Sequence, residues 1–264
     1  MLCFSRLGQV GRLGNQLFQV AFITYFAKKH GIDYQMPFWK YADYFDYEFN
    51  FVDQEIQARP FDLIIKEPAL GYHEDFFINF LPQIRTENVD IITGYFQSYK
   101  YFSKSHVLQI FKPSNKFTPE KINVSKSVAV SVRRGDFVKH SDYNNIEAPI
   151  FLDLLKQFPD FKVYIFSDDY KYCKANFIGS QFEFMEGLND IEQLLTLRQF
   201  EYFLLSNSTF SYWGPMLSSS PKKVYYPYYM FPSLDRCKLY NEYYWPDEPE
   251  TYISYRNPIN KPLL

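Results

Sequence analysis

With 264 residues, of which 47% are apolar, the chain is long enough for one large α/β domain or for two domains of about 130 residues each. A formal net charge of −2 excludes a global basic field, so nucleic acid is not expected as the main partner. Three cysteines stand far apart without a CxxC pair, and no apolar run approaches the ~18 residues of a membrane span, which together predict a cytoplasmic location and no zinc site.

The chain opens with a short apolar strand, LCFSRL, and a glycine-bracketed turn, GRLGN, at residues 11–15. A helix follows from about Gln16 to Lys29, and such a turn at a helix start favours an anion, because free N–H groups and the helix dipole both point at it. Gly8, Gly11 and Gly14 are spaced three and three, whereas the dinucleotide fingerprint needs two and three. An NAD enzyme, with Asp33 as the ribose-binding acid, therefore stays only an alternative. In the turn itself, Arg12 supplies a cation and Asn15 an amide.

The next part of the chain divides less clearly. Residues 37–83 show no clean period and predict irregular structure, whereas DIITGYF, residues 90–96, predicts a strand that leads into a helix through Gln97 and Ser98. Residues 111–126 are rich in Pro, Ser, Asn and Lys and predict a domain boundary. The expected organisation is an N-terminal, acceptor-side α/β domain at 1–115, a nucleotide-binding Rossmann-like domain at 116–240, and a segment at 241–264 that packs back on the first domain.

Strands and helices alternate regularly in the second domain. The sequence predicts strands at 127–132, 162–167, 201–206 and 223–227, separated by helices at 149–158, 190–199 and 211–219. This alternation predicts a parallel sheet, whose ligands bind beyond the carboxyl ends of the strands.

Charged residues follow the first of these strands. Two guanidiniums, those of Arg133 and Arg134, can make bidentate bonds to a diphosphate, and Gly135 allows close backbone approach. The alternative is an Arg–Asp pair that closes the loop, and this alternative suits Asp136 better than ligand binding does.

The next two strands also end in polar residues. Asp168 and Asp169 predict either a metal that holds a nucleotide diphosphate or a carboxylate that accepts the edge N–H groups of guanine, and helix capping is the alternative for one of them. Ser208, Thr209 and Ser211 place hydroxyls around a helix N-terminus, which is either a second anion site or a plain cap.

Five stretches in this order and spacing resemble the bacterial type of α-1,2-fucosyltransferase of glycosyltransferase family 11. They are GRLGNQLFQ (11–19), GYFQSYKYF (94–102), SVRRGDF (131–137), FSDDYKYCKANF (166–177) and SNSTFSYWG (206–214). The resemblance implies a GT-B fold of two Rossmann-like domains, GDP-β-L-fucose as donor, the 2-hydroxyl of a terminal galactose as acceptor, inversion at the anomeric carbon, and no metal or other cofactor. Animal members carry an N-terminal membrane anchor that this chain does not show.

The resemblance also implies roles for single residues. Arg133 contacts the donor diphosphate and is the catalytic candidate, with Arg134 nearby; an acid at Asp168 or Asp169 reads guanine, and hydroxyls of Thr209 and Ser211 approach the phosphates. The donor-binding set implied in this way, together with neighbours at the same strand ends, is Arg12, Gly14, Asn15, Ser131, Arg133, Arg134, Asp168, Asp169, Ser208, Thr209 and Ser211. Asn15 is a second catalytic candidate, and Gly11, Gly135 and Asp136 are expected to be structural. Many members carry His where this chain has Ser131.

Several questions stay open at the level of sequence. No residue can be named as the base that accepts the acceptor's proton; His73, Glu74 and Asp75 are in the acceptor domain, but a surface loop is the preferred interpretation of that stretch. The rival functions are a transferase that uses GDP-mannose or a UDP-sugar, and a noncatalytic glycan-binding module. The acceptor is a galactose-terminated oligosaccharide or a glycolipid, so peripheral contact with a membrane also stays open.

Overall fold

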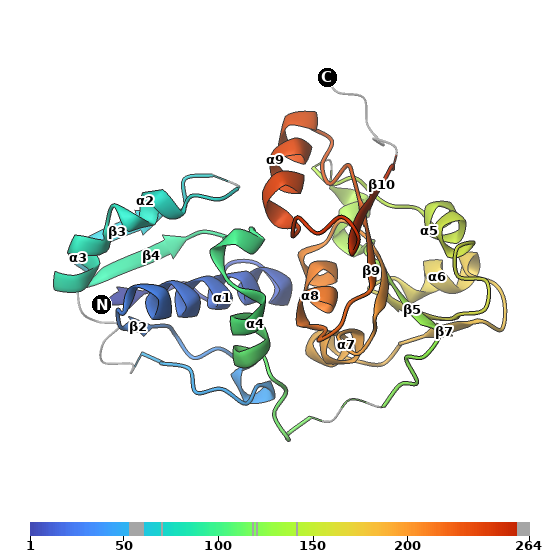
Figure 1. Cartoon of the computed structure of the whole chain (residues 1–264), viewed down its shortest axis with the longest axis horizontal. Helices are drawn as coiled ribbons and strands as arrows, with labels where there is room; N and C mark the ends of the chain where they lie inside the picture. Colours follow the sequence, from blue (N-terminus) through green and yellow to red (C-terminus); the bar gives the residue numbers. More distant parts are fainter. Residues whose placement is uncertain (53–60, 70, 118, 120, 141, 258–264) are drawn as a thin grey trace. The chain divides into compact units, whose positions relative to one another are not determined.

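The computed structural model describes residues 1–52, 61–69, 71–117, 119, 121–140 and 142–257. The chain forms two compact units, Met1–Thr118 and Pro119–Leu264, so the division falls three residues after the expected one at 115/116. Both units contain a parallel sheet with helices connecting its strands (Figure 1).

The first unit contains a four-stranded sheet in the order β2-β1-β4-β3. Its strands are β1 (Leu2–Cys3), β2 (Tyr34–Gln35), β3 (Leu63–Lys66) and β4 (Val89–Thr93). Its helices are α1 (Leu13–His30), α2 (Glu74–Ile78), α3 (Leu81–Thr86) and α4 (Lys104–Ile110), with 3₁₀ turns η1 (Ala42–Tyr44) and η3 (Tyr99–Tyr101).

Helix α1 is the central helix of this unit. It begins at Leu13, three residues before the predicted start, and 13 of its 18 residues are buried. It ends at Gly31, which has a φ of 61° and caps the last turn in the left-handed region that glycine adopts without strain. Lys28, Lys29 and His30 lie in the last turn, where the helix dipole favours cations.

The expectation of irregular structure over residues 37–83 is wrong in part. The described residues of that stretch include η1, β3 and α2 and the start of α3, while residues 53–60 and 70 lie outside the described residues. Glu74 is 8% exposed at the start of α2 rather than on a surface loop. The expected helix through Gln97 and Ser98 is also wrong, because 3₁₀ turn η3 and helix α4 begin later, at Tyr99 and Lys104.

The second unit contains a six-stranded parallel sheet in the order β10-β9-β8-β5-β6-β7. Its strands are β5 (Ser127–Val132), β6 (Lys162–Ser167), β7 (Phe182–Phe184), β8 (Tyr202–Leu205), β9 (Lys223–Pro227) and β10 (Tyr252–Tyr255). Its helices are η4 (Gly135–Lys139), α5 (Ala148–Leu155), α6 (Tyr170–Asn176), α7 (Asp190–Leu197), α8 (Thr209–Leu217) and α9 (Leu234–Tyr244).

Strand β5 is fully buried because helices cover both faces of this sheet. Val128, Val130 and Val132 share one core cluster with Ala148 and Phe151 of α5. Successive side chains of a strand point to opposite faces, and Ser131 accordingly meets Ser211 of α8 on the other face. Figure 1 shows α7 and α8 on one side of the sheet and α5 and α6 on the other.

The described part of residues 241–264 belongs to the second unit, and its expected packing on the first domain stays a prediction. Strand β10 pairs in parallel with β9 over four residues and forms the edge of the second sheet. Aromatic packing holds the preceding residues in the same unit: the Trp245 ring lies 4.9 Å from Tyr212 of α8 and 5.9 Å from Tyr252 of β10, measured between ring centroids. Residues 258–264 lie outside the described residues.

Candidate active site

The strand order of the second sheet places its ligand-binding edge between β5 and β8. Strands β5, β6 and β7 follow one another outward on one side, and β8, β9 and β10 do so on the other. The direction in which the chain adds strands to the sheet therefore reverses at the parallel β5–β8 pair. In doubly wound sheets, ligands bind at the carboxyl ends of the strands at this switch point. A pocket of about 470 Å³, including its open mouth, lies there. It is lined by Ser131, Val132, Arg133, Phe166, Ser167, Asp168, Asp190, Gln193, Ser208, Phe210 and Ser211.

Serine hydroxyls connect the two central strand ends. Ser211 Oγ lies 2.7 Å from Ser131 Oγ and 3.2 Å from Ser206 Oγ, and Ser206 Oγ also accepts the backbone N–H of Arg133 at 3.0 Å. Ser208 caps α8 by accepting the N–H of Phe210 at 3.1 Å. The first turn of α8 therefore opens on the pocket, with its N–H groups and dipole favouring an anion.

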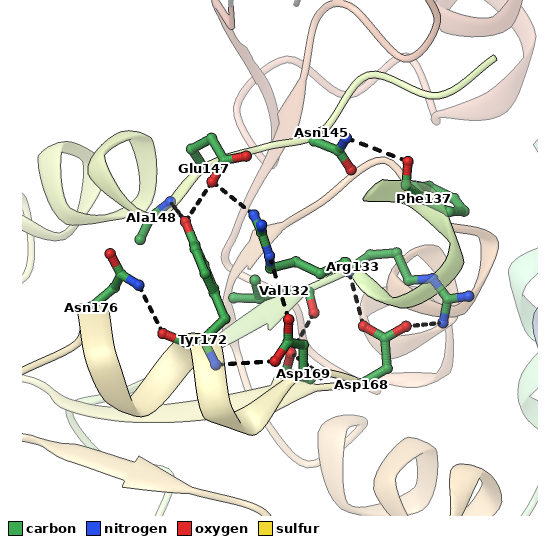
Figure 2. Close-up of polar contacts among 12 residues, drawn as sticks. Val132, Arg133, Phe137, Asn145, Glu147, Ala148, Asp168, Asp169, Tyr172 and Asn176 are labelled. Carbon is green, nitrogen blue, oxygen red and sulfur yellow. Dashed lines mark hydrogen bonds and ion pairs between the residues drawn. The ribbon is translucent and has the colours of Figure 1, made fainter. Parts of the chain in front are cut away.

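Arg133 projects from the end of β5 and is held by two carboxylates. Its Nη1 lies 2.7 Å from Asp168 Oδ2 (Figure 2). Its Nη2 pairs with Asp136. The guanidinium also lies over the Phe137 ring, 5.1 Å from its centroid. The Arg133 side chain is 16% exposed, so it presents a largely desolvated cation at the pocket wall.

Arg134 is held on the side of α5 and α6 and does not line this pocket. Its Nη1 donates to Glu147 Oε2 at 2.7 Å, and its guanidinium carbon lies 3.5 Å from the centroid of the Tyr172 ring. The Tyr172 hydroxyl donates to the same Glu147 oxygen at 2.6 Å, and Figure 2 shows this pair beside the ends of β5 and β6. Arg134 therefore connects β5 to α5 and α6.

The two neighbouring aspartates have different surroundings. Asp168 lines the pocket, and its Oδ1 accepts the backbone N–H of Arg134 at 2.8 Å. Asp169 caps α6 by accepting the N–H of Tyr172 at 3.0 Å and lies 3.7 Å from Arg134 Nε. The capping alternative thus describes Asp169, and the loop-closing ion pair describes Asp136. Thr209, like Asp169, is absent from the pocket lining among the described residues.

Gly135 occupies a position where a side chain would not fit. A Cβ placed on it would lie 2.3 Å from Asp168 Oδ2, so a larger residue would displace the carboxylate that pairs with Arg133. Its expected structural role follows from this close approach.

Asp190 and Gln193 line the same pocket from the first turn of α7, and the sequence did not single them out. Asn189 and Glu192 form a capping box there, so the stretch reads as an ordinary helix start. The sequence pattern did not indicate β7, a three-residue edge strand. This strand places the start of α7 at the ligand-binding edge of the sheet.

The glycine turn of the first unit forms its own polar network. Gly11 has a φ of 76°, and a Cβ on it would lie 2.5 Å from Asn15 Nδ2. Gln16 donates to Gly11 O at 3.0 Å and accepts from Trp39 Nε1 at 3.0 Å, while Gln97 Nε2 donates to Asn15 Oδ1 at 2.8 Å. Arg12 is the N-cap residue of α1, and Gly14 is its second residue.

The three cysteines are buried and free. Burial raises the pKa of the Cys3 thiol to about 12 and that of Cys173 to about 11, so neither is a thiolate near neutral pH. Among the described residues, no three metal-ligating side chains gather at one place. No helix in the described part of the chain has the length and apolarity to cross a bilayer.

Comparison with known proteins places this geometry in a family. The chain is 30% identical over 146 residues to the alpha-1,2-colitosyltransferase of Escherichia coli, a match that covers 48% of this chain and 50% of that protein. The chain thus spans about half the length of that relative. Its fold is similar to that of NodZ, an alpha-1,6-fucosyltransferase from Bradyrhizobium, in a crystal soaked with GDP-fucose and in another grown with GDP. Each of these two comparisons has a TM-score of 0.56 and 11% identity, and covers 84% of this chain and 93% of NodZ.

This likeness confirms the predicted α/β fold of the GT-B class, with two Rossmann-like domains. The sequence profile of glycosyl transferase family 11 matches residues 88–241, which is more than half of the chain and includes the β5–β8 site. The chain therefore belongs to glycosyl transferase family 11.

Proposed function

We propose that this glycosyltransferase moves L-fucose from GDP-β-L-fucose to the 2-hydroxyl of a terminal galactose, with inversion at the anomeric carbon. The observation that carries the proposal is the pocket at the β5–β8 switch point, where Arg133, four serines and the start of α8 converge. A guanidinium and a helix N-terminus at one site match the two negative charges of a nucleotide diphosphate. The α-1,2 linkage takes support from the name of the relative in Escherichia coli, and the donor from the ligands of the NodZ crystals.

Arg133 has the central chemical role in this proposal. Departure of GDP places additional negative charge on the β-phosphate, and a cation in a water-poor pocket stabilises that charge more in the transition state than in the ground state. The diphosphate competes with Asp136 and Asp168 for the guanidinium. Asp136 is the carboxylate that a phosphate displaces, because its side chain is 40% exposed, compared with 28% for Asp168.

Asp190 takes the role of base recognition in place of the two aspartates after β6. Asp169 caps α6 and is absent from the described pocket lining, and Asp168 is bound to Arg133; Asp190 lines the pocket from the start of α7. A carboxylate there accepts the N1–H and the exocyclic N–H of guanine. Uracil lacks the exocyclic amine, so this contact favours a GDP-sugar over a UDP-sugar.

Nucleotide-induced stabilisation tests this recognition directly. We expect GDP to raise the Tm of the wild-type protein more than IDP, which lacks the 2-amino group, and more than UDP, because a ligand that binds only the folded state stabilises it. Asp190→Asn replaces one of the two carboxylate oxygens that accept hydrogen bonds from guanine. It should therefore reduce the difference between the Tm rises caused by GDP and by IDP. Glu192→Gln is the matched control, because Glu192 belongs to the same helix but serves the capping box.

Three outcomes contradict parts of this account. Stabilisation by UDP with added manganese, but not by GDP, favours a UDP-sugar transferase with Asp168 and Asp169 as metal ligands. Stabilisation by free galactosides and by no nucleotide favours a glycan-binding module. If GDP raises the Tm of Asp190→Asn above that with IDP by as much as it does for the wild type, another group recognises the base.

A second candidate donor is GDP-colitose, which the name of the Escherichia coli relative favours. Colitose lacks the 3-hydroxyl of fucose, so the two donors share the nucleotide and the anomeric centre. A kcat/KM for GDP-fucose at least tenfold above those for GDP-colitose and GDP-mannose supports the fucose assignment. For colitose the reason is that a site that bonds the 3-hydroxyl discriminates against a sugar without it. The reverse order assigns the enzyme to colitose or mannose. We place the reaction in the cytoplasm, on an oligosaccharide or on a glycolipid reached by peripheral membrane contact.

A further inference from the structure

A half-buried carboxylate from one strand end holds the loop that follows the next strand in the first unit. Glu67 follows β3, and its Oε2 accepts the backbone N–H groups of Tyr95 at 2.7 Å and Phe96 at 3.1 Å. Its Oε1 accepts from Phe96 at 3.2 Å and from the Tyr101 hydroxyl at 3.5 Å. Two consecutive amides therefore converge on one side chain, at the carboxyl end of β4.

This convergence fixes a backbone conformation that the sequence would otherwise disfavour. Phe96 has a φ of 51°, which is uncommon for a residue other than glycine. Its ring is stacked on Phe22 of α1, with 3.9 Å between ring centroids. Gly94 leaves room for this turn, because a Cβ there would lie 2.5 Å from the Phe96 ring and 2.9 Å from Glu67 Cβ.

The other side of the same loop is bonded to the first turns of α1. Gln19 Nε2 donates to Gly94 O at 2.9 Å, and Gln97 Nε2 donates to Asn15 Oδ1 at 2.8 Å. The loop is thus bonded to Glu67 through its Tyr95 and Phe96 amides and to Asn15 through the next side chain, that of Gln97. Because Gln97 occupies the Asn15 oxygen, the Asn15 amide is oriented with its N–H₂ group free to point elsewhere.

We propose that Glu67 is a positioning residue for sugar transfer, which sets the loop at 94–97 and through Gln97 fixes the orientation of the Asn15 amide. The proposal rests on the proposed function in one respect, namely that Asn15 acts on the donor or acceptor during turnover. Glu67 itself touches no reacting atom in this account; it acts through the loop.

The ionisation of Glu67 gives the proposal a pH signature. Burial raises the pKa of Glu67 to about 7, and hydrogen bonds from Phe96, Tyr95 and Tyr101 oppose the shift without cancelling it. The titratable group against it is the Tyr101 hydroxyl, which also accepts the His73 backbone N–H at 2.8 Å, and the Tyr72 ring packs on Tyr101 at 5.0 Å. Protonation replaces an acceptor by a donor, so the loop loses one of its bonds as the pH falls through about 7.

The first test compares Glu67→Gln with Glu74→Gln. Glu74 is a buried carboxylate of this unit, paired with Lys29 at 2.6 Å and with the Tyr72 hydroxyl, and within the described residues it does not contact the loop. We expect the wild-type kcat to rise with pH through one limb near pH 7. In Glu67→Gln this pH dependence of kcat should disappear, and kcat at pH 8 should be about tenfold lower than in the wild type. The KM for GDP-fucose should change little. Glu74→Gln should keep the limb.

A second readout does not depend on turnover. Amide hydrogen exchange in Glu67→Gln should become about tenfold faster in two peptides, one over residues 94–98 and one over residues 11–16. The other peptides of the first unit should change no more than they do in Glu74→Gln. If the wild type makes no fucosylated product, the proposed function fails, and this exchange pattern still decides whether Glu67 orders the Asn15 turn.

Two results overturn the proposal. One is a Glu67→Gln protein that keeps the wild-type limb and kcat. The other is equal loss of activity in both variants with exchange raised throughout the unit, because that pattern belongs to a residue needed only for stability.

Discussion

At the scale of single residues, the two adjacent arginines after β5 have different roles although the sequence presents them as a pair. Arg133 lines the switch-point pocket between Asp136 and Asp168. Arg134 lies against Tyr172 with its guanidinium bonded to Glu147. The carboxyl end of a strand sends successive side chains to opposite faces, so neighbours in sequence need not share a site.

Arg133→Ala tests the first role. Removing a preorganised donor to the leaving group should cost about 3 kcal/mol in the transition state, or about 100-fold in kcat. Arg133→Lys keeps the charge but not the fork geometry, so its kcat should lie between those of the alanine variant and the wild type. Steady-state kinetics with a far-ultraviolet spectrum as the folding control provide the measurement. A folded Arg133→Ala enzyme with near wild-type turnover refutes the assignment.

Arg134→Ala tests the second role. The substitution removes the cation over the Tyr172 ring and leaves Glu147 without its guanidinium partner, so it should lower the free energy of unfolding by about 2 kcal/mol. Urea unfolding measures this loss. The KM for GDP-fucose should change far less in Arg134→Ala than in Arg133→Ala. A larger change in KM in Arg134→Ala would show that Arg134 binds the donor.

Some site residues were predictable from sequence because their chemistry is local. Ser131, Arg133, Asp168, Ser208 and Ser211 all lie at strand ends or a helix start and were expected to bind the donor, and the structure brings these five into one pocket. Asp190 could not be found in the same way, because its place at the site depends on β7, a three-residue strand that is too short to carry a periodic signal.

At the scale of elements, the packing of α1 on α4 contains a neutral buried histidine. His106 of α4 is 4% exposed, and its Nε2 lies 2.9 Å from Thr24 Oγ1 of α1. Burial lowers the pKa of His106 to about 4, and the charge of Lys28 adds to this effect. The imidazole therefore stabilises the fold only in its neutral form.

This histidine predicts a loss of stability in acid. Because its folded pKa is lower than the ordinary value of 6.5, the unfolded chain binds the proton first, and stability falls as the pH drops from about 6.5 towards 4. From pH 7 to pH 5 the wild type should lose roughly 2 kcal/mol relative to His106→Gln. Urea unfolding at both values measures the difference, with the exposed His140→Gln as control. If the free energy of unfolding falls equally in the wild type and in His106→Gln between pH 7 and pH 5, His106 does not cause the loss of stability in acid.

Buried strands of the second unit followed directly from the sequence, and edge elements did not. Strands β5 and β6 have the predicted bounds of 127–132 and 162–167, because continuous apolar runs are needed where helices cover both faces. Strand β10 lies at the sheet edge, where residues such as Ser254 face outward and weaken the pattern. In the first unit β1 has only two residues, too few for any periodicity.

At the scale of the whole molecule, the arrangement of strands creates the site. The sequence predicted that strands and helices alternate, but the order β10-β9-β8-β5-β6-β7 arises from long-range pairing that no local pattern encodes. That order alone brings the end of β5 beside the end of β8, and with them Arg133 beside Ser206 and the start of α8. The family motifs around these residues then connect the geometry with sugar transfer.

The most direct test of the central claim is the product formed from lactose and GDP-fucose by the purified protein in excess EDTA. Mass spectrometry with linkage analysis should show lactose plus one fucose, attached to the 2-position of galactose, with no metal required. Fucose at any other position, a product that forms only with added metal, or no product from a folded protein that GDP stabilises would contradict the proposed α-1,2-fucosyl transfer.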